Sequence, residues 1–214
     1  KKGSVIRQLS VYMWNRGNSR MTEPMYWMSL NNLNIVTMIE SKNDFYEYVL
    51  ADMKANKVAD NFMKYFNVIY KYLYCLRKVA YFYNTHKNRL SLMFWELMLK
   101  HYSVQTGITI DPNSFGKGLY LPHYGYIVVN PSAHFGENCV VQCGVNVSES
   151  VEGGDSVYLG AGCKLMIGVH IKTGTIVGAN AVVTKDFDEE NIVVAGIPAK
   201  KISNKGMLSG RLKI

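Results

Sequence analysis

The sequence predicts an α+β protein, in which a helical region is followed by a parallel β-helix. Two observations predict this fold class: the distribution of glycine and proline, and the spacing of apolar residues. From Asp44 to Gln105 the chain has neither glycine nor proline, and its apolar residues recur three and four positions apart, as on one face of an α-helix. After Gly107 glycine is frequent and apolar residues recur every six positions, a spacing that neither a helix nor a simple alternating strand produces.

Three helices are expected before Gly107. The first spans about Asp44–Ala55, with Asp44 in the first turn, where a negative charge suits the helix dipole. The second is expected through residues 62–83, because an apolar stripe follows the helical period there. Its members are Phe62, Phe66, Ile69, Tyr70, Leu73, Leu76, Val79 and Tyr83. The third spans about Arg89–Tyr102. Residues 1–37 show no sustained period, so no regular element is assigned to them.

The repeat after Gly107 predicts short strands separated by turns. Counting in sixes from Val129 to Val183 gives ten positions, of which nine are apolar and the tenth is Gly153. A second row, four places further on in each hexad, is small or β-branched. Three strands then close one coil of eighteen residues, and the apolar rows stack inside. Gly153 lies in "SESVEGGDS", which we interpret as a loop or a loosened corner.

Length and charge narrow the class of protein. A chain of 214 residues that is 48% hydrophobic can bury a sizeable core. Lysine and arginine outnumber acidic residues by fifteen to seven in residues 1–106, whereas residues 107–214 hold nine of each. A basic, aromatic-rich half could face nucleic acid, an anionic membrane surface or an acidic polymer, but ordinary solvated helix faces are the simpler interpretation.

Neither a membrane span nor a metal site is expected. No run of about eighteen apolar residues occurs, and no secretory signal pattern is seen, so the cytoplasm is the expected location. The four cysteines form no CxxC pair and have no histidine at zinc spacing. We interpret them as buried free thiols. They are Cys75, Cys139, Cys143 and Cys163.

Two stretches resemble a known family. The repeat array followed by "GANAVVTKDFDEENIVVAGIPAKKI" is similar to the left-handed β-helix (hexapeptide-repeat) acyltransferases, and "GLYLPHYGYIVVNPSAHFGENCVVQCGVNV" is similar to their serine acetyltransferase-like branch. The resemblance covers about Ile108–Ile202 and implies that the β-helix is left-handed. "MIESKNDFYEYVLADMKAN" resembles the start of branch members thought to acetylate capsule or lipopolysaccharide sugars. The expected division is a poorly defined segment at 1–37, a helical domain at 38–106, the acyltransferase domain at 107–202 and a tail at 203–214.

The resemblance implies a homotrimer, or a dimer of trimers, with acetyl-CoA in the groove between neighbouring β-helices and no metal. One histidine acts as general base in this family, and it corresponds to His123. The serine-specific members use a second histidine from the loop after the coil that matches "GVNV". The matching stretch here, "SESVEGGDS", has no histidine. This departure weakens the case for free serine as the acceptor.

The chemistry of acetyl transfer explains why a histidine suits this position. The alcohol proton must be removed as the oxygen attacks the thioester, and an imidazole titrates near neutrality. Without the resemblance, a structural histidine at a coil corner is the simpler interpretation of His123. Asp111 is the candidate for orienting the ring, and a turn aspartate before Pro112 is the alternative. Candidates for binding the acceptor, each also explicable as a turn or groove residue, are Tyr124, Asn130, Gln142 and Asn146.

Coenzyme A would be held by backbone groups and lysines. Small residues let a pantetheine arm approach the backbone, and lysines can neutralise the adenosine phosphates. The candidates are Gly160, Ala161, Gly178, Ala179, Lys185, Lys200 and Lys201. Turn geometry and solvation explain these residues equally well. The other histidines are interpreted as surface or structural: His86, His101, His134 and His170.

The sequence therefore predicts an acetyl-CoA-dependent O-acetyltransferase that acts on a sugar or a surface-polysaccharide precursor. Serine O-acetyltransferase of cysteine synthesis and a non-catalytic trimeric scaffold are the alternatives. Peripheral membrane contact is a further hypothesis, because the helical half is basic and such precursors are lipid-linked. Nucleic acid is not an expected partner, because charge without a recognition motif gives only nonspecific, salt-sensitive binding.

Overall fold

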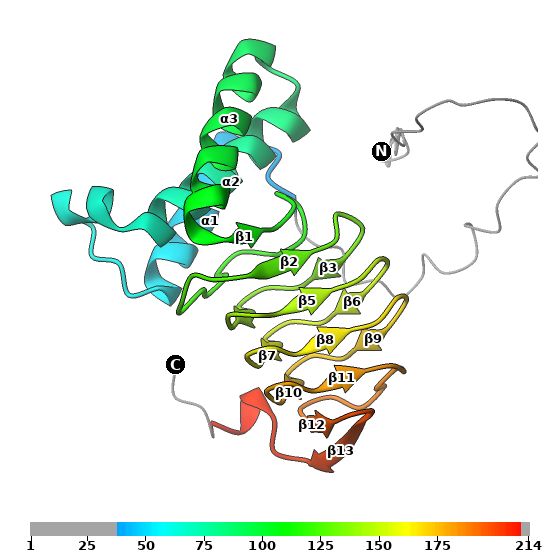
Figure 1. The fold of residues 1–214 in the computed structure, drawn as a ribbon. Helices are drawn as coiled ribbons and strands as arrows, with labels where there is room; N and C mark the ends of the chain where they lie inside the picture. The colour runs from blue at the N-terminus through cyan, green and yellow to red at the C-terminus, as the bar shows by residue number, and fades with distance from the viewer. Residues whose placement is uncertain (1–37, 211–214) are drawn as a thin grey trace, which may run out of the picture. The chain divides into compact units, whose positions relative to one another are not determined.

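The computed structural model of the chain describes residues 38–210. In this part of the chain, helices precede a parallel β-helix of thirteen short strands, which confirms the predicted fold class (Figure 1). The helices are α1 (Lys42–Ala55), the 3₁₀ helix η1 (Phe62–Phe66), α2 (Val68–Thr85), α3 (Arg89–Thr106) and, after the last strand, the 3₁₀ helix η2 (Met207–Ser209). The expectation for residues 1–37 lies outside the described residues.

The first helices begin where side chains cap their first turns. At α1 the Ser41 hydroxyl accepts the Asp44 amide at 3.1 Å, and the Asp44 carboxylate accepts the Ser41 amide at 2.8 Å, which completes a capping box. Asn67 caps α2 by accepting the Tyr70 amide at 3.0 Å. Within residues 38–210, the helices are too short or too polar to cross a bilayer.

The segment before Asn67 departs from the prediction. The apolar stripe predicts one helix through residues 62–83, but η1 and α2 are separate. Asn61 and Asn67 each cap their own helical start, and both have extended backbone, as a capping residue requires. The extended conformation of Asn67 ends any continuous helix. Phe62 and Phe66 are consequently exposed rather than buried in the stripe.

The strands form three sheets, one along each face of the β-helix, parallel except for the last strand. Sheet A holds β1 (Ile108–Thr109), β2 (Ile127–Val129), β5 (Asn146–Val147), β8 (Lys164–Leu165) and β11 (Val182–Val183). Sheet B holds β3 (His134–Phe135), β6 (Glu152–Gly153) and β9 (His170–Ile171). Sheet C holds β4 (Val140–Val141), β7 (Tyr158–Leu159), β10 (Ile176–Val177), β12 (Val193–Gly196) and β13 (Ala199–Ser203), which pairs antiparallel with β12. Val140 pairs with Tyr158, so a coil has the predicted eighteen residues.

The two predicted rows of apolar and small residues fill the interior of the β-helix, and Gly153 is the one position of the first row without an apolar side chain. The nine apolar members of the first row are each 2% exposed or less. Gly153 lies in β6, which pairs with β3 and β9, so the predicted loop at "SESVEGGDS" is wrong. A Cβ on Gly153 would overlap the ring of Phe135, which stacks on Phe115 at 4.8 Å between ring centroids. The Phe135 ring occupies the space that a side chain at 153 would need.

A buried ion pair joins the helical region to the first coil. Asp52 of α1 and Arg77 of α2 are 2% and 1% exposed, and Arg77 Nε lies 2.8 Å from Asp52 Oδ2. Both side chains also bind the backbone of the first coil. Arg77 donates to the carbonyls of Phe115 and Gly116, and Asp52 accepts the amides of Gly118 and Leu119, at 2.8–2.9 Å.

Asn56 extends this junction toward the next turn. Its Nδ2 donates to Leu119 O at 2.8 Å, and its Oδ1 accepts Leu121 N at 3.0 Å. Residues 115–121 pair with the second coil along one edge. The helical side chains bind backbone groups on the opposite edge, which a preceding coil would otherwise pair with. The junction joins both parts in one compact unit, and the division into two domains at Gly107 stays a proposal.

Candidate active site

The turns from sheet C to sheet A stack into one corner of the β-helix, which we call the C–A corner. It consists of residues 121–126, 142–145, 160–163 and 178–181. Backbone bonds join successive turns: Gly162 N donates to Cys143 O at 2.9 Å, and Asn180 N donates to Ala161 O at 2.8 Å. Residues eighteen positions apart therefore line up along this corner.

His123 lies in the first turn of the C–A corner, and its side chain is exposed. The turn is held on both sides, because Leu121 N binds Asn56 and Gly125 N donates to Thr106 O at 2.8 Å. Among the described residues, none makes a hydrogen bond or ion pair with the His123 ring. The imidazole is therefore held by its backbone, and both ring nitrogens are open to a ligand.

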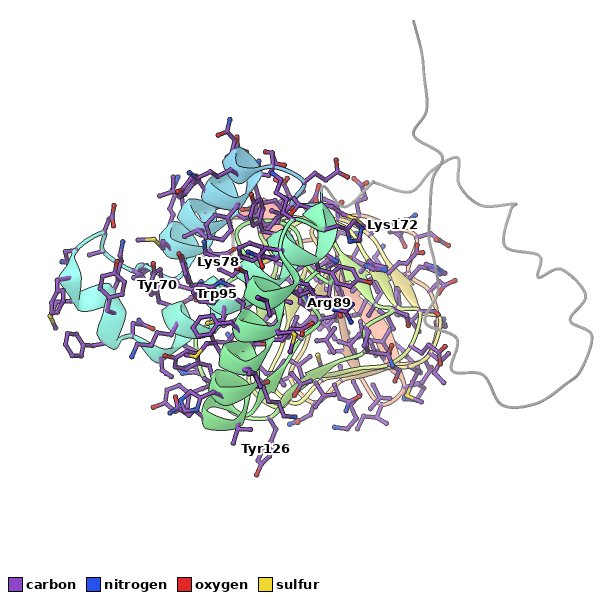
Figure 2. The ribbon with its side chains drawn as sticks, turned by 90° about the horizontal axis from the view of Figure 1, so that it is seen from above. Tyr70, Lys78, Arg89, Trp95, Tyr126 and Lys172 are labelled. Atoms are coloured by element: carbon purple, nitrogen blue, oxygen red, sulfur yellow. The ribbon has the colours of Figure 1, made fainter. Side chains whose placement is uncertain are left out.

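Two of the predicted acceptor-binding residues share this corner with His123. Tyr124 follows in the same turn and is 65% exposed. Gln142 lies half-buried in the second turn. Asn146 is exposed on the outer face of β5, on the adjoining sheet A. Tyr126, which sequence reasoning did not single out, is 85% exposed and points away from the molecule (Figure 2).

Asn130 lies at a different corner. The turns from sheet A to sheet B form the A–B corner, which consists of residues 110–113, 130–133, 148–151, 166–169 and 184–186. There the Asn130 Oδ1 accepts the Ser132 amide at 3.0 Å and the Ser132 hydroxyl at 2.9 Å. These bonds are those of a turn residue. Within one chain, sheet A separates Asn130 from His123.

Asp111 also lies at the A–B corner. Its Oδ1 accepts the Asn113 amide at 3.0 Å, as expected for an aspartate in a turn. Burial raises the pKa of Asp111, while the Asn113 bond and the nearby His134 act to lower it. The histidine that Asp111 faces within one chain is thus His134, and the structure does not bring Asp111 and His123 together in a single chain.

The four small candidates for coenzyme A binding lie on the third and fourth turns of the C–A corner. Gly160 is buried, Gly178 and Ala161 are half-buried, and Ala179 is exposed. A Cβ on Gly160 would come within 2.6 Å of Val177 O, so the close approach of two coils already requires glycine there. None of the four carries a side chain larger than a methyl group, and all but Gly160 are at least partly exposed.

The three lysine candidates are not together. Lys185 lies at the A–B corner, with its Nζ 5.8 Å from the centroid of the Phe187 ring. Lys201 forms an ion pair with Glu189. Lys200 is exposed on β13 opposite Ala195, which in turn lies against Gly178. Lys200 is therefore the lysine candidate that lies at the end of the C–A corner.

The other described histidines lie elsewhere. His134 and His170 stand on the outer face of sheet B with Glu152 between them in register. His170 lies 3.5 Å from Glu152 and 3.4 Å from Asp186. In residues 38–210 no group of three or more histidine, cysteine or acidic side chains is arranged to hold a metal ion.

No sequence pattern indicates the role of Asn56, which helps to hold the His123 turn. Its bond to Leu121 N spans 65 positions, and the bond from Gly125 N to Thr106 O also crosses the boundary between helices and strands. Side chains that bind across such distances follow no periodic rule. Only the folded arrangement identifies them.

Comparisons with known proteins agree with this architecture. None of the known family models matches the chain. The chain is 28% identical over 120 residues to the serine acetyltransferase of Synechococcus elongatus, a match of 51% of this chain and 49% of that protein. It is 29% identical over 115 residues to a serine acetyltransferase of Staphylococcus aureus, covering 50% and 54%. The chain thus spans about half the length of the curated relatives it matches.

Solved structures share this fold over 76% to 79% of the chain. A Neisseria gonorrhoeae serine acetyltransferase in complex with serine is 25% identical, with a TM-score of 0.58 over 76% of this chain and 71% of that chain. A Brucella abortus serine acetyltransferase in complex with coenzyme A has a TM-score of 0.61 at 22% identity, over 79% and 72%. In fold the chain is similar to the hexapeptide-repeat acetyltransferases. Within that class, its sequence is similar to the serine acetyltransferases.

Proposed function

We propose that the protein is an acetyl-CoA-dependent O-acetyltransferase with His123 as its general base. One observation carries this proposal: His123, whose exposed imidazole has no bonded partner among the described residues, lies on the same corner as a strip of small, mostly half-exposed residues. Such a strip suits a thin pantetheine arm that binds along the backbone. The similarity to serine acetyltransferases supports the same activity.

The reaction needs one proton acceptor. The acceptor hydroxyl gives its proton to the His123 ring while its oxygen attacks the thioester carbonyl. A carbon–oxygen bond forms and the carbon–sulfur bond breaks. The imidazolium then returns the proton to the departing thiolate, so that the products are an O-acetyl ester and free coenzyme A. Gln142 and Tyr124, on the same corner, are the candidates for binding the acceptor.

L-Serine is the first acceptor to test, because the curated matches are serine acetyltransferases. A sugar hydroxyl is the second candidate, and one observation favours it. The family resemblance implies a second histidine on a loop after Val147 in serine-specific members. Residues 148–156 instead continue the coil through β6 and contain no histidine. The acceptor side of the site therefore lacks a group that serine-specific members use.

We further propose that the enzyme is a homotrimer, either alone or paired into a dimer of trimers. A corner of a β-helix is convex, so it cannot enclose a ligand without a second surface. In a three-fold assembly each chain uses two different surfaces, and the A–B corner of one chain can meet the C–A corner of the next. That arrangement would bring Asn130 and Asp111 of a neighbour to His123, and it would complete a groove for coenzyme A.

Replacement of His123 by alanine tests the proposal. We expect the release of free thiol from acetyl-CoA to fall by about 10²- to 10⁴-fold, because the general base is lost. Binding of coenzyme A, measured by calorimetry, should be unchanged, since the small-residue strip is intact. The assay uses L-serine and a panel of sugars, so that it also ranks the acceptors.

The matched control is His101→Ala, which removes another exposed imidazole, on α3. It should leave turnover unchanged. Full turnover in His123→Ala would remove the catalytic role of His123. Failure of the unmodified protein to bind coenzyme A would favour the non-catalytic scaffold instead.

A further inference from the structure

The segment between α1 and α2 carries an exposed apolar cluster that the proposed function does not use. Four of the five residues of η1 are large and apolar or aromatic, and they are strongly exposed. These are Phe62 at 72%, Met63 at 65%, Tyr65 at 54% and Phe66 at 67%. We call them the η1 cluster. In Figure 2 this segment, in pale cyan, stands out from the body of the molecule.

The rings of the η1 cluster contact one another rather than the protein core. The Phe62 ring centroid lies 6.1 Å from that of Tyr65 and 5.5 Å from that of Phe66. Among the described residues, Tyr65 is the ring of the cluster that contacts an aromatic ring outside it, at 6.3 Å from Tyr70 between centroids. The cluster therefore gains little from burial within the fold.

The backbone of the segment is held in place, so the exposure is a property of the folded state. Asn61 Oδ1 accepts the Met63 amide at 2.9 Å at the start of η1. At its end Asn67 N donates to Lys64 O at 3.1 Å, and the Asn67 side chain caps α2. Two capping asparagines thus hold the aromatic side chains outward.

The charges around the cluster are mostly positive. Residues 53–72 contain four lysines and one acidic residue. The acidic residue is Asp60, and Lys64 Nζ lies 2.6 Å from its carboxylate, which neutralises that charge. Lys54 and Lys57 are exposed. An aromatic cluster with a surplus of lysines matches an anionic surface that also accepts apolar groups.

We propose that the η1 cluster and its lysines bind an anionic lipid surface. Aromatic side chains favour the headgroup level of a bilayer, where an apolar ring and a polar edge are both accommodated. Nearby lysines are attracted to acidic headgroups. The surplus of lysines around the cluster favours an anionic lipid over a second copy of the chain, because the same surface on that copy would carry the same positive charge. The proposal goes beyond the acetyl-transfer activity and does not depend on it.

Flotation with lipid vesicles tests the proposal on the full chain. We expect the protein to float at low salt with vesicles of phosphatidylcholine and phosphatidylglycerol, and not with phosphatidylcholine alone. The double variant Phe62→Ser/Phe66→Ser should reduce the bound fraction by at least about tenfold, because two large apolar side chains no longer enter the headgroup region. Lys54→Gln/Lys57→Gln should weaken binding most at low salt, where screening is least.

The matched control is Leu90→Ser/Leu97→Ser on α3. These leucines are 78% and 70% exposed, as much as the two phenylalanines, but lie outside the η1 cluster. The control variant should float like the unmodified protein. Equal loss of vesicle binding in Phe62→Ser/Phe66→Ser and in Leu90→Ser/Leu97→Ser would overturn the proposal. Failure of the unmodified protein to float would also overturn it.

Two further readouts separate this proposal from others. Light scattering of Phe62→Ser/Phe66→Ser should give the same mass as the unmodified protein. A lower mass would show that another copy of the chain covers the cluster, which would overturn lipid binding as its role. Coenzyme A binding and turnover with a water-soluble acceptor should be unchanged in Phe62→Ser/Phe66→Ser and in Leu90→Ser/Leu97→Ser. Failure of lipid binding is therefore distinguishable from failure of the acetyltransferase proposal.

Discussion

Asp52 and Arg77 show how two charged side chains can be buried without losing their partners. Each is almost fully enclosed, and hydrogen bonds with the other residue and with the backbone of the first coil replace bonds to water. Burying an ion pair costs desolvation energy, which such bonds offset. Removal of one partner leaves the other as an unpaired buried charge. The pair is therefore sensitive to single substitutions.

Arg77→Met should lower the free energy of unfolding by about 3–5 kcal/mol, because Asp52 and the carbonyls of Phe115 and Gly116 lose their donor. Urea denaturation followed by circular dichroism measures this change. Lys117→Met is the matched control, since Lys117 forms an exposed ion pair with Glu47 across the same junction, at 3.4 Å. That pair should contribute less than about 1 kcal/mol. Equal effects of the two substitutions would contradict our interpretation of the buried pair.

At the scale of single elements, the β-helix depends on how side chains in successive coils share the interior. Strand β6 has glycine at the inward position, and strand β3 beside it has the large ring of Phe135. The two positions together hold about one large side chain. This complementarity explains how a coil with an apparent defect in its repeat still stacks regularly.

Gly153→Ala should lower the free energy of unfolding by about 1–3 kcal/mol, because the added methyl group would overlap the Phe135 ring. In the double variant Phe135→Leu/Gly153→Ala the ring is gone, so the cost should be smaller than the sum of the two single costs. A double-mutant cycle measured by urea denaturation gives this coupling. Strictly additive costs would show that the ring does not limit position 153.

The elements also show what sequence patterns can and cannot predict. The β-helix is predictable because its rule is local: one residue in six must be apolar, and the positions in that row are buried as expected. The join between η1 and α2 was not predictable from the apolar stripe, because two asparagine caps override a weak periodicity. His123, Gln142 and the small-residue strip fall on one corner, as the period requires. Asn130 and Lys185 fall on the A–B corner, because each lies in a turn that follows a strand of sheet A.

At the scale of the whole molecule, one chain presents two kinds of corner that have different residues. The C–A corner carries His123, and the A–B corner carries Asn130 and Asp111. When each copy uses one surface to contact a different surface of the next copy, the copies form a closed ring if the rotation between them adds up to a full turn. For a triangular β-helix, a ring of three is the arrangement that we propose.

Multi-angle light scattering should therefore give the mass of three chains, or of six if trimers pair. The mass should not change at the micromolar concentrations of an activity assay, because a groove built from two chains requires the assembled state for binding. A monomer that binds coenzyme A with full affinity would contradict a site shared between chains. A monomer that does not bind coenzyme A would contradict the proposed trimer and would agree with a binding site that needs two chains.

The side chains of Asp52, Asn56 and Arg77 bear on whether two β-helices can pair end to end. A solenoid of stacked strands has two open ends, and each open end offers backbone amides and carbonyls to any other strand that arrives. Here side chains of the helical region bind backbone groups of the first coil, while at the other end the antiparallel strand β13 pairs with β12 and covers that strand of sheet C. We therefore expect the helical region to disfavour end-to-end pairing of two copies at the end that it covers.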